Sequence, residues 1–389
     1  MKILVIEGCN YIDYPLGGQM NFMRDMRKVF GNDLALVGIT TEKETPVGKW
    51  CKKIIDGVEF DYFSTSYHEK SNKRPIIPSR ITGFINTKKY MKRILSIEFD
   101  YILLQAPEVF FALPKDVLDR TLMRMPGVGN PLSISRYSYG KFFAKIYDNY
   151  FSKRASKLSK ILATANEEAI QDFLKRGKDR VKRENIIIFP TRYNEKFYNV
   201  LDRNETRKAI GIKENSIVFT TVGRLNWFKG WKLMLDAFDI VCKEVPDSHL
   251  YFIGDGEEKS KIIAYAVEKG LSDNVTMLGS QGPTEIAKYI NASNAFIMGS
   301  YKEGWSTTLV EACACGVPCV VTDFSSAKEM VENGVNGYVI KNRDEADFAD
   351  KMKKVLSLDR NAVVEYDKKY ANLAISRMKD EITAVFKQM

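Results

Sequence analysis

Short apolar segments rich in β-branched residues recur along this chain, and stretches with helical spacing separate them. In the C-terminal half these apolar segments are 217–222, 250–253, 275–278, 295–298 and 318–321. Parallel strands that follow one another in sequence need a crossover connection, usually a helix. The alternation therefore predicts an α/β fold with a parallel, doubly wound sheet.

The N-terminal half repeats this pattern less regularly. Its predicted strands are 2–6, 34–37, 101–105, 120–125, 161–164 and 186–189. The strand pattern ends near 190–204, where polar residues take over, so we predict one domain over 1–195 and a second over 196–369. The last segment, about 370–389, has its apolar residues mostly on one helical face. We expect this final helix to pack back on the first domain.

Charge is distributed unevenly between the two halves. Residues 1–190 hold 32 Lys and Arg against 21 Asp and Glu, a net charge of +11, whereas residues 191–389 carry −1. Such asymmetry favours an anionic partner, either nucleic acid or a membrane surface. Motifs of RNA- or DNA-binding proteins do not occur in the sequence, so we expect no nucleic-acid partner.

The sequence contains no run of about 18 apolar residues, so we expect no transmembrane helix. The apolar start is interrupted by Glu7, which is typical of a buried first strand and not of a signal peptide. We therefore expect a cytoplasmic protein that can associate peripherally with the inner leaflet of the cell membrane.

Three cysteines lie close together, Cys313, Cys315 and Cys319. Their spacing lacks the paired C-x2-C pattern of structural zinc sites, and the surrounding residues are small and apolar. We predict buried packing residues there. The two histidines, His68 and His249, are also predicted to be structural.

One loop-to-helix segment, 303–311, follows the predicted strand 295–298. Helix N-termini carry about +0.5 charge and suit phosphate groups. The backbone N–H groups that would open this helix belong to Thr307, Thr308 and Leu309. Glu303 and Glu311 can accept hydrogen bonds from a sugar diol. The alternative is that Glu303 is only a helix-start charge and Glu311 a solvated residue.

A second segment, 223–230, ends the predicted strand 217–222 and opens a helix. Arg224 and Lys229 would project at the same sheet edge as Glu303. Two fixed cations there can neutralise a diphosphate leaving group. Alternatively, both cations are simply solvated on a loop.

Taken together, these segments resemble family 4 glycosyltransferases, which are retaining enzymes of the GT-B fold. The matching pieces follow the family's order across about residues 215–340: Gly-Arg-Leu…Lys-Gly at 223–230, Ile-Gly-Asp-Gly at 253–256, Glu-x7-Glu at 303–311, Glu-Ala…Gly-Val-Pro at 311–318 and Asn-Gly-Val-Asn-Gly at 333–337. The resemblance implies two Rossmann-like domains that face each other across a cleft, with the C-terminal helix crossing back to the N-terminal domain.

The resemblance also implies the site and the reaction. Arg224 and Lys229 would hold the donor diphosphate, Glu303 would contact the donor sugar and Glu311 the ribose hydroxyls. The expected reaction is retaining transfer from a nucleotide diphosphate sugar to a lipid-linked or cell-surface glycan precursor in polysaccharide biosynthesis. We expect no cofactor and no metal, since no Asp-x-Asp pair occurs. Alternatives are another nucleotide-sugar reaction, such as epimerisation, or a non-catalytic subunit.

The N-terminal half matches this family more weakly. Gly17 and Gly18 follow the first strand, and the family places this loop over the donor, although a Gly-Gly pair alone indicates only a turn. Many relatives have a histidine at the position near 124–127, and this chain has none there. Arg124 is a candidate contact for the sugar or the acceptor, and the sequence assigns no base to the acceptor.

A basic stretch, 70–93, mixes seven Lys and Arg residues after Lys70 with Ile, Phe and Tyr. One interpretation is a solvated charged face. The other is a surface that docks on anionic lipid, where each cation adds about 1 kcal/mol. Because the resembled family binds its acceptor with the N-terminal domain, a lipid-linked acceptor would explain why the charge is confined to that half.

Overall fold

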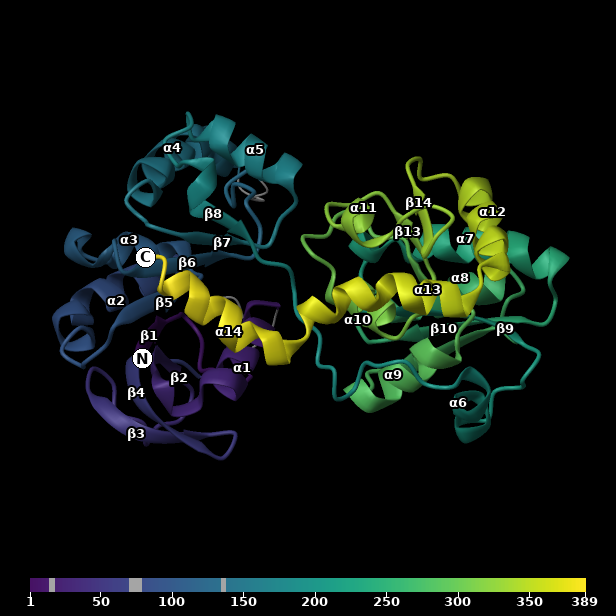
Figure 1. Ribbon diagram of the computed structural model, residues 1–389, viewed down its shortest axis with the longest axis horizontal. Helices are drawn as coiled ribbons and strands as arrows, with labels where there is room; N and C mark the ends of the chain where they lie inside the picture. Colours follow the sequence, from purple (N-terminus) through teal and green to yellow (C-terminus); the bar gives the residue numbers. More distant parts are fainter. Residues whose placement is uncertain (14–17, 70–78, 134–137) are drawn as a thin grey trace. The chain divides into compact units, whose positions relative to one another are not determined.

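The computed structural model describes residues 1–13, 18–69, 79–133 and 138–389. They form two compact units (Figure 1). Unit 1 comprises Met1–Pro190 and Met378–Met389, and unit 2 comprises Thr191–Arg377. The segment 191–195 thus lies in unit 2, whereas the sequence assigned it to the first domain.

In unit 1 the described residues build one eight-stranded sheet in the order β3-β4-β2-β1-β5-β6-β7-β8. Its strands are β1 (Ile3–Ile6), β2 (Leu34–Thr40), β3 (Trp50–Ile55), β4 (Val58–Tyr67), β5 (Tyr101–Leu104), β6 (Thr121–Met125), β7 (Ile161–Ala163) and β8 (Ile186–Ile188). All neighbours pair in parallel except β3 and β4. The strand order reverses between β1 and β5, the point at which open α/β sheets bind ligands.

The antiparallel hairpin of β3 and β4 was not predicted. Its turn is Asp56-Gly57, and both residues have positive φ, 51° and 77°, as a two-residue hairpin turn of this kind requires. Strand β3 alternates half-buried residues with exposed ones such as Lys52. An edge strand of this composition has no continuous apolar run, so a search for buried strands misses it.

Helices cover both faces of the sheet in unit 1 (Figure 1). They are α1 (Gly18–Phe30), α2 (Ser79–Ile94), α3 (Pro107–Ala112), α4 (Ser138–Ala155), α5 (Glu167–Arg176) and α14 (Ile375–Phe386). Helices α1 and α14 share one core cluster, and α2 to α5 share the other. In the part of the chain that is described, no helix combines the length and the apolar character needed to cross a bilayer.

The final helix starts later than predicted. A 3-10 segment, η6 (Lys368–Leu373), precedes it, and the chain is extended at Ala374. The Tyr193 N–H donates to the Leu373 carbonyl at 3.1 Å, and the Ile375 N–H donates to the Tyr193 carbonyl at 3.0 Å. This pairing interrupts the helical hydrogen bonds, so α14 begins at Ile375. Residues 378–389 pack in unit 1 as predicted, whereas 370–377 belong to unit 2.

Helix α14 should contribute strongly to the stability of unit 1. Phe386 is fully buried and stacks on Tyr101, with ring centroids 4.6 Å apart. Phe386→Ala is expected to lower the free energy of unfolding by about 3–5 kcal/mol, because the cavity cannot close fully. Urea denaturation followed by circular dichroism measures this change. Lys387→Ala, at an exposed neighbour, should change it by less than about 0.5 kcal/mol; equal midpoints for the two variants would contradict the packing.

Unit 2 contains, among its residues, one parallel six-stranded sheet in the order β11-β10-β9-β12-β13-β14. Its strands are β9 (Ile217–Val222), β10 (Ser248–Ile253), β11 (Val275–Gly279), β12 (Ala295–Met298), β13 (Cys319–Thr322) and β14 (Gly337–Ile340). Its helices are α6 (Arg203–Ile210), α7 (Trp231–Glu244), α8 (Lys259–Glu268), α9 (Pro283–Ala292), α10 (Thr307–Ala314), α11 (Ala327–Met330), α12 (Glu345–Lys354) and α13 (Arg360–Asp367). The predicted doubly wound parallel sheet is confirmed. Its order reverses between β9 and β12.

The two histidines and the three clustered cysteines, which were predicted to be structural, contact neighbouring protein groups or lie in the core. His68 Nε2 is 2.9 Å from the Ser66 hydroxyl, and His249 Nε2 is 2.8 Å from the Thr276 hydroxyl. The thiols of the cysteine run are buried and free: Cys313, Cys315 and Cys319. They belong to the core cluster of unit 2 that packs around α10 and β13.

Candidate donor site

Two loops of unit 2 leave the sheet at the point where its strand order reverses. Strands β9 and β12 are neighbours, with Phe219 opposite Ala295 and Thr220 opposite Phe296. Both strands are parallel, so the loops 223–230 and 299–306 emerge at the same edge. Predicted site residues therefore come together from two distant parts of the sequence.

Lys229 and Glu303 are in direct contact. Lys229 Nζ lies 2.6 Å from Glu303 Oε1, and the Ser300 hydroxyl donates to the same oxygen at 2.7 Å. The two side chains are 29% and 16% exposed, so the pair is mostly shielded from water. An ammonium group has three donors, so Lys229 can keep this contact and still bind a phosphate oxygen.

Arg224 lies at the outer side of the same loop. Its side chain is 72% exposed, and its Nη2 is 3.3 Å from Glu257 Oε2. Arg224, Lys229 and Ser300 nevertheless line one cavity of about 20 Å³. That volume is close to the space one water molecule needs, so the cavity is too small to enclose a diphosphate.

Glycines allow these loops to approach one another closely. A Cβ atom on Gly254 would lie 1.9 Å from the Gly223 carbonyl oxygen, and one on Gly256 would lie 2.3 Å from the Leu225 carbonyl oxygen. Gly230, with φ +65°, would place a Cβ 1.8 Å from the Gly299 oxygen. No side chain fits at such distances. Gly230, Gly254 and Gly256 of the Gly-Arg-Leu…Lys-Gly and Ile-Gly-Asp-Gly motifs are thus needed for packing between the loops.

Helix α10 opens at the end of the second loop, and Ser306 is its N-cap. The Ser306 hydroxyl accepts a hydrogen bond from the Leu309 N–H at 3.4 Å. Thr307 and Thr308 are the first two residues of the helix, where backbone N–H groups have no partner within the helix. The Leu309 N–H already has an acceptor in this structure, so of the three predicted phosphate donors it is the least available.

Glu311 lies one turn further along α10, on a half-buried face. Burial, the charge of Glu311 and a hydrogen bond to Glu311 together raise the pKa of Tyr198 above its usual range. Tyr198 is buried in the core of unit 2, in the segment that follows the boundary at residue 190. The sequence did not indicate this tyrosine, because the contact joins residues far apart in the chain.

Tyr198→Phe tests whether this hydrogen bond orients Glu311. The variant keeps the buried ring, so its melting temperature should change little. Loss of one hydrogen bond to a charged group costs about 1.5–3 kcal/mol. The ribose contact that the resemblance implies for Glu311 therefore predicts a fall in nucleotide affinity of roughly tenfold or more, measured by calorimetric titration of a nucleoside diphosphate. Tyr366→Phe, which removes an exposed tyrosine–glutamate contact at Glu332, is the control; equal affinities for both variants would contradict the assignment.

Arg343 holds the backbone of the second loop by hydrogen bonds, and the sequence did not identify it as part of the site. Its Nη1 donates to the Ser300 carbonyl at 2.9 Å and its Nη2 to the Gly299 carbonyl at 2.5 Å. The guanidinium group lies 3.5 Å from the centroid of the Tyr301 ring. Arg343 thereby fixes the backbone that leads to Glu303.

The N-terminal candidates lie in unit 1. Gly18 is the first residue of α1, directly after the loop that follows β1, and Gly17 lies outside the described residues. Arg124, on β6, is only 5% exposed; it donates to the Gln105 side chain and its guanidinium lies 4.3 Å from the Phe22 ring centroid. Such burial leaves little of Arg124 for a ligand.

The sequence did not identify Glu7 or Gln105 as site residues, although Glu7 directly follows the predicted strand 2–6 and Gln105 ends the predicted strand 101–105. Glu7 Oε1 accepts a hydrogen bond from the Gln105 N–H at 2.6 Å. Burial raises the pKa of Glu7 to about 8. Together with Arg124 they form a buried polar cluster at the carboxyl ends of β1, β5 and β6.

A cavity of about 130 Å³ lies next to this cluster. Its walls come from the ends of β5 and β6 and from α4 and α5: Met123, Met125, Tyr147, Phe151 and Phe173. Arg80, Gln105, Asn130 and Asp148 add polar groups. An apolar space with a few polar groups is typical of a small-molecule site.

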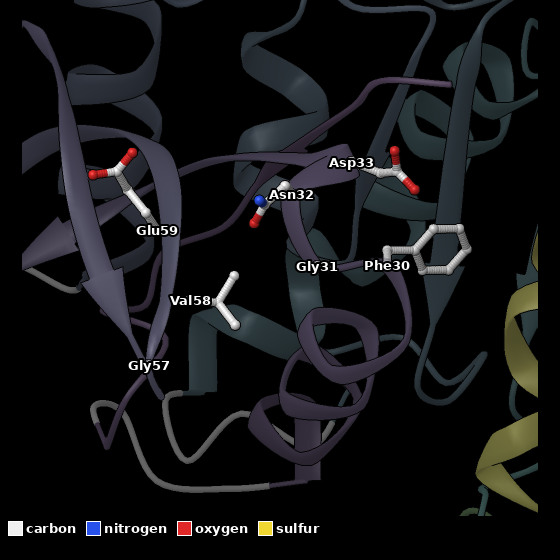
Figure 2. Close-up of a pocket in the computed structure, with 7 residues that line it drawn as sticks. All are labelled: Phe30, Gly31, Asn32, Asp33, Gly57, Val58 and Glu59. Atoms are coloured by element: carbon white, nitrogen blue, oxygen red, sulfur yellow. The ribbon is translucent and has the colours of Figure 1, made fainter.

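A second hollow in unit 1 has a different character. Figure 2 shows it between the end of α1 and the β3–β4 turn, lined by residues that include Asp33 and Glu59. Asp33 directly precedes β2 and Glu59 lies at the start of β4, so the hollow is at the amino ends of these strands. Ligands of such sheets bind at the carboxyl ends, so we assign it no role.

Comparisons with known proteins match a large part of unit 2 to a known family. Residues 202–374 match the family described as glycosyl transferases group 1. The N-acetyl-alpha-D-glucosaminyl L-malate synthase of Bacillus anthracis is 30% identical over 157 residues, 40% of each chain. The lipopolysaccharide 1,6-galactosyltransferase of Salmonella typhimurium is 32% identical over 148 residues, 37% of this chain and 41% of that protein. The chain thus spans about two fifths of the length of these curated relatives.

Solved structures extend the comparison to the whole chain. The sucrose-phosphate synthase from Thermosynechococcus elongatus has a TM-score of 0.73 and 17% identity, with complete coverage of both chains. The Anabaena protein HepE, in complex with UDP and glucose, has a TM-score of 0.71 and 16% identity, also with complete coverage. At this identity the likeness concerns the fold alone, and it confirms the GT-B fold class. Residues 202–374, which carry the candidate donor site, are the part of the chain that matches the glycosyl transferases group 1 family.

Proposed function

We propose that this protein is a retaining glycosyltransferase that moves a sugar from a nucleotide diphosphate sugar to a glycan or lipid-linked acceptor. The observation that carries the proposal is the meeting of Lys229, Glu303 and Arg224 at the strand-order reversal of unit 2. These are the cations and the carboxylate that the motifs assign to the diphosphate and the donor sugar.

The chemistry follows from these charges. As the bond between the anomeric carbon and the diphosphate oxygen breaks, negative charge grows on the leaving group. Lys229 and Arg224 stabilise that charge, and the N-terminus of α10 adds the positive end of its dipole. Glu303 accepts hydrogen bonds from the donor sugar, and Glu311 accepts them from the ribose. The acceptor oxygen then bonds to the anomeric carbon on the face that the diphosphate leaves, and its hydroxyl proton passes to the departing diphosphate oxygen, so the products are the glycoside and the nucleoside diphosphate.

Uridine diphosphate sugars are the first donors to test. The Anabaena HepE structure contains UDP and glucose, and a 29% identical relative from Escherichia coli is named UDP-Gal:alpha-D-GlcNAc-diphosphoundecaprenol alpha-1,3-galactosyltransferase, matched over 41% of this chain and 42% of that protein. A carboxylate for the ribose and an anion site for the diphosphate suit any such nucleotide.

Thermal stabilisation by a panel of nucleotide sugars tests the donor. A ligand at 100 times its Kd should stabilise the folded state by about 2.7 kcal/mol. Anomeric NMR of the product then distinguishes retention from inversion, and release of free epimer without transfer would indicate an epimerase. No stabilisation by any nucleotide sugar would favour a non-catalytic subunit.

Because two side-chain cations face the diphosphate in the proposed site, the rate of transfer should be unchanged when EDTA removes divalent metal ions. A loss of activity in EDTA that Mg²⁺ restores would contradict a metal-free reaction.

The acceptor is proposed to bind unit 1, in or beside the cavity at the ends of β5 and β6. Its apolar walls and its polar groups Arg80 and Asp148 suit an amphipathic molecule. Met125→Trp should fill this space of about 130 Å³ and raise the KM for acceptor without changing donor affinity. An unchanged KM for acceptor would show that the acceptor binds elsewhere.

Membrane association is proposed for the same unit. In α2, Ile81 and Ile85 are 51% and 54% exposed and share a face with exposed Lys88 and Lys92. Helix α4 adds exposed apolar residues, and its Tyr150 contacts α3 through Phe111, with ring centroids 5.3 Å apart. Apolar side chains flanked by cations are typical of surfaces that lie on anionic bilayers. Residues 70–78 of the basic stretch lie outside the described residues.

Vesicle sedimentation tests this surface. Binding to vesicles with 30% anionic lipid should be strong at 0.05 M salt and weak at 1 M, where the Debye length is about 3 Å. The triple variant Lys88→Glu, Lys89→Glu, Lys92→Glu should lose about 90% of the binding. The variant Lys196→Glu, Lys208→Glu, Lys213→Glu changes the net charge equally on exposed positions of unit 2 and is the control. If both triple variants lose vesicle binding equally, or if the protein binds neutral vesicles as well as anionic ones, the basic stretch is only a solvated charged face.

A further inference from the structure

Three arginine side chains of unit 2 meet at the C-terminal end of α9. Arg203 and Arg207 are one turn apart on α6, so they share a face of that helix. Arg207 Nε donates to the Ala292 carbonyl at 2.8 Å, and Arg360 Nη1 donates to the Asn291 carbonyl at 2.9 Å. Two of the guanidinium groups therefore lie on adjacent carbonyls, and the charge of Arg203 acts on both. We call Arg203, Arg207 and Arg360 the arginine cluster.

The arginine cluster lies at the amino ends of the strands of unit 2. Helix α9 ends at Ala292 and β12 begins at Ala295, whereas the loop that contains Glu303 follows the other end of β12. Arg207 Nη1 also donates to the Glu214 carbonyl, in the segment that precedes β9. The donor loops emerge from the carboxyl ends of β9 and β12. A ligand of the arginine cluster therefore occupies a site separate from the donor site.

The end of α9 explains the positions of Arg207 and Arg360 but not that of Arg203. The last carbonyl groups of a helix and the negative end of its dipole attract cations, and both arginines donate to such carbonyls. Arg203 is only partly exposed, and its Nε is buried without a hydrogen-bond partner among the described residues. No carboxylate in the described part of the chain forms an ion pair with the cluster; Asp202, the nearest in sequence, caps α6 instead. A buried donor of this kind costs free energy until an acceptor reaches it.

Repulsion between like charges adds to this cost. Burial lowers the pKa of Arg207 to about 10, and the charge of Arg203 is the next largest cause. Burial, followed by the charge of Arg203, also lowers the pKa of Arg360 to about 10. All three groups are still cationic at neutral pH. The folded protein thus holds three positive charges together, and Arg203 and Arg360 are partly open to solvent, from which an anion can approach.

We propose that the arginine cluster binds a phosphate-type anion, either free phosphate or the phosphate group of a small metabolite. A guanidinium group can form two parallel N–H···O bonds with such a group, and a phosphate group offers more acceptor oxygens than a carboxylate. Asn291 connects the cluster to the chain before α6, because its Oδ1 accepts from the Leu201 N–H at 2.9 Å and from Arg360 Nη2 at 3.0 Å. A bound anion stabilises the end of α9 and this segment together. This inference does not depend on the proposed function.

Thermal denaturation of the full chain in inorganic phosphate tests the site, with sodium chloride at equal ionic strength as the reference. Saturating phosphate should raise the melting temperature of the wild type by about 3 °C or more above its value in chloride. In chloride, Arg203→Gln should melt at or above the wild-type temperature, because it removes a repelled charge. In phosphate the order should reverse, and calorimetric titration should show phosphate affinity about tenfold weaker in Arg203→Gln. Glucose 1-phosphate is the second probe: tighter binding than that of free phosphate, also lost in Arg203→Gln, would identify a metabolite as the source of the phosphate group.

Two further variants separate this site from other cations. Arg377→Gln removes an exposed arginine of unit 2, and Lys229→Ala removes a cation of the candidate donor site; both should keep the stabilisation by phosphate. The proposal is overturned if phosphate stabilises the wild type no more than chloride does, or if Arg203→Gln is stabilised by phosphate as much as the wild type. It is also overturned if Lys229→Ala abolishes the stabilisation, because phosphate would then bind at the donor site.

Discussion

Lys229→Ala is expected to lower the rate of sugar transfer by about 10²–10³-fold. Lys229 lies 2.6 Å from Glu303. In the proposed donor site its removal would take a cation from the leaving group and also leave a shielded carboxylate beside the diphosphate. Each loss weakens stabilisation of the charge that grows as the glycosidic bond breaks. Initial rates with the donor identified in the nucleotide-sugar panel measure the effect.

Arg224→Ala should be less severe, by about 10–100-fold, because the Arg224 side chain is 72% exposed and water screens its charge. Lys232→Ala is the control, since Lys232 is an exposed lysine that pairs with Asp236 one turn further along α7. Wild-type rates in both Lys229→Ala and Arg224→Ala would refute the donor site. Equal loss in Lys232→Ala would point to a general effect of charge.

The second large expected effect, on stability and donor binding, comes from substitution of a glycine and not of a charged residue. Gly230→Ala is expected to lower the free energy of unfolding by about 3–5 kcal/mol and to abolish donor binding. Its φ is +65°, and the new Cβ would lie 1.8 Å from the Gly299 carbonyl oxygen. The conformational strain costs about 1–2 kcal/mol, and the overlap forces the two donor loops apart.

Gly270→Ala is a matched control, because Gly270 has φ +70° and a Cβ added there would meet no atom within 4 Å. It should cost only the conformational term, about 1–2 kcal/mol, with unchanged nucleotide affinity. Chemical denaturation and UDP titration of both variants separate the cost of backbone strain from the cost of the atomic overlap between the loops. Similar losses in the two variants would show that the close approach of the loops is unimportant.

The sequence determined most of the sheet in unit 2 and the location of the donor loops. Segments such as 217–222 and 295–298 coincide with β9 and β12, since buried parallel strands have apolar runs that end at glycine-rich turns. The order of the motifs also identified the loops at the strand-order reversal. These are local patterns, and local physical chemistry is enough to produce them.

Less regular elements were not predicted from the sequence. The β3–β4 hairpin has polar, half-exposed residues, and β14 (Gly337–Ile340) is four residues long and follows a turn-rich segment. The end of the chain reads as one helix, but the backbone pairing of Ala374 with Tyr193 interrupts it. Periodicity within a segment contains no information about a partner strand nearly two hundred residues away.

Tertiary structure alone decided how the site residues meet. The contact of Lys229 with Glu303 exists because β9 and β12 are adjacent, and that of Tyr198 with Glu311 because the segment after residue 190 packs against α10. The contact between the Trp227 and Tyr301 rings and the contacts of Arg343 arise in the same way. Sequence patterns specify which residues can be buried or capped, whereas distances between loops depend on strand order and packing, which only the folded chain fixes.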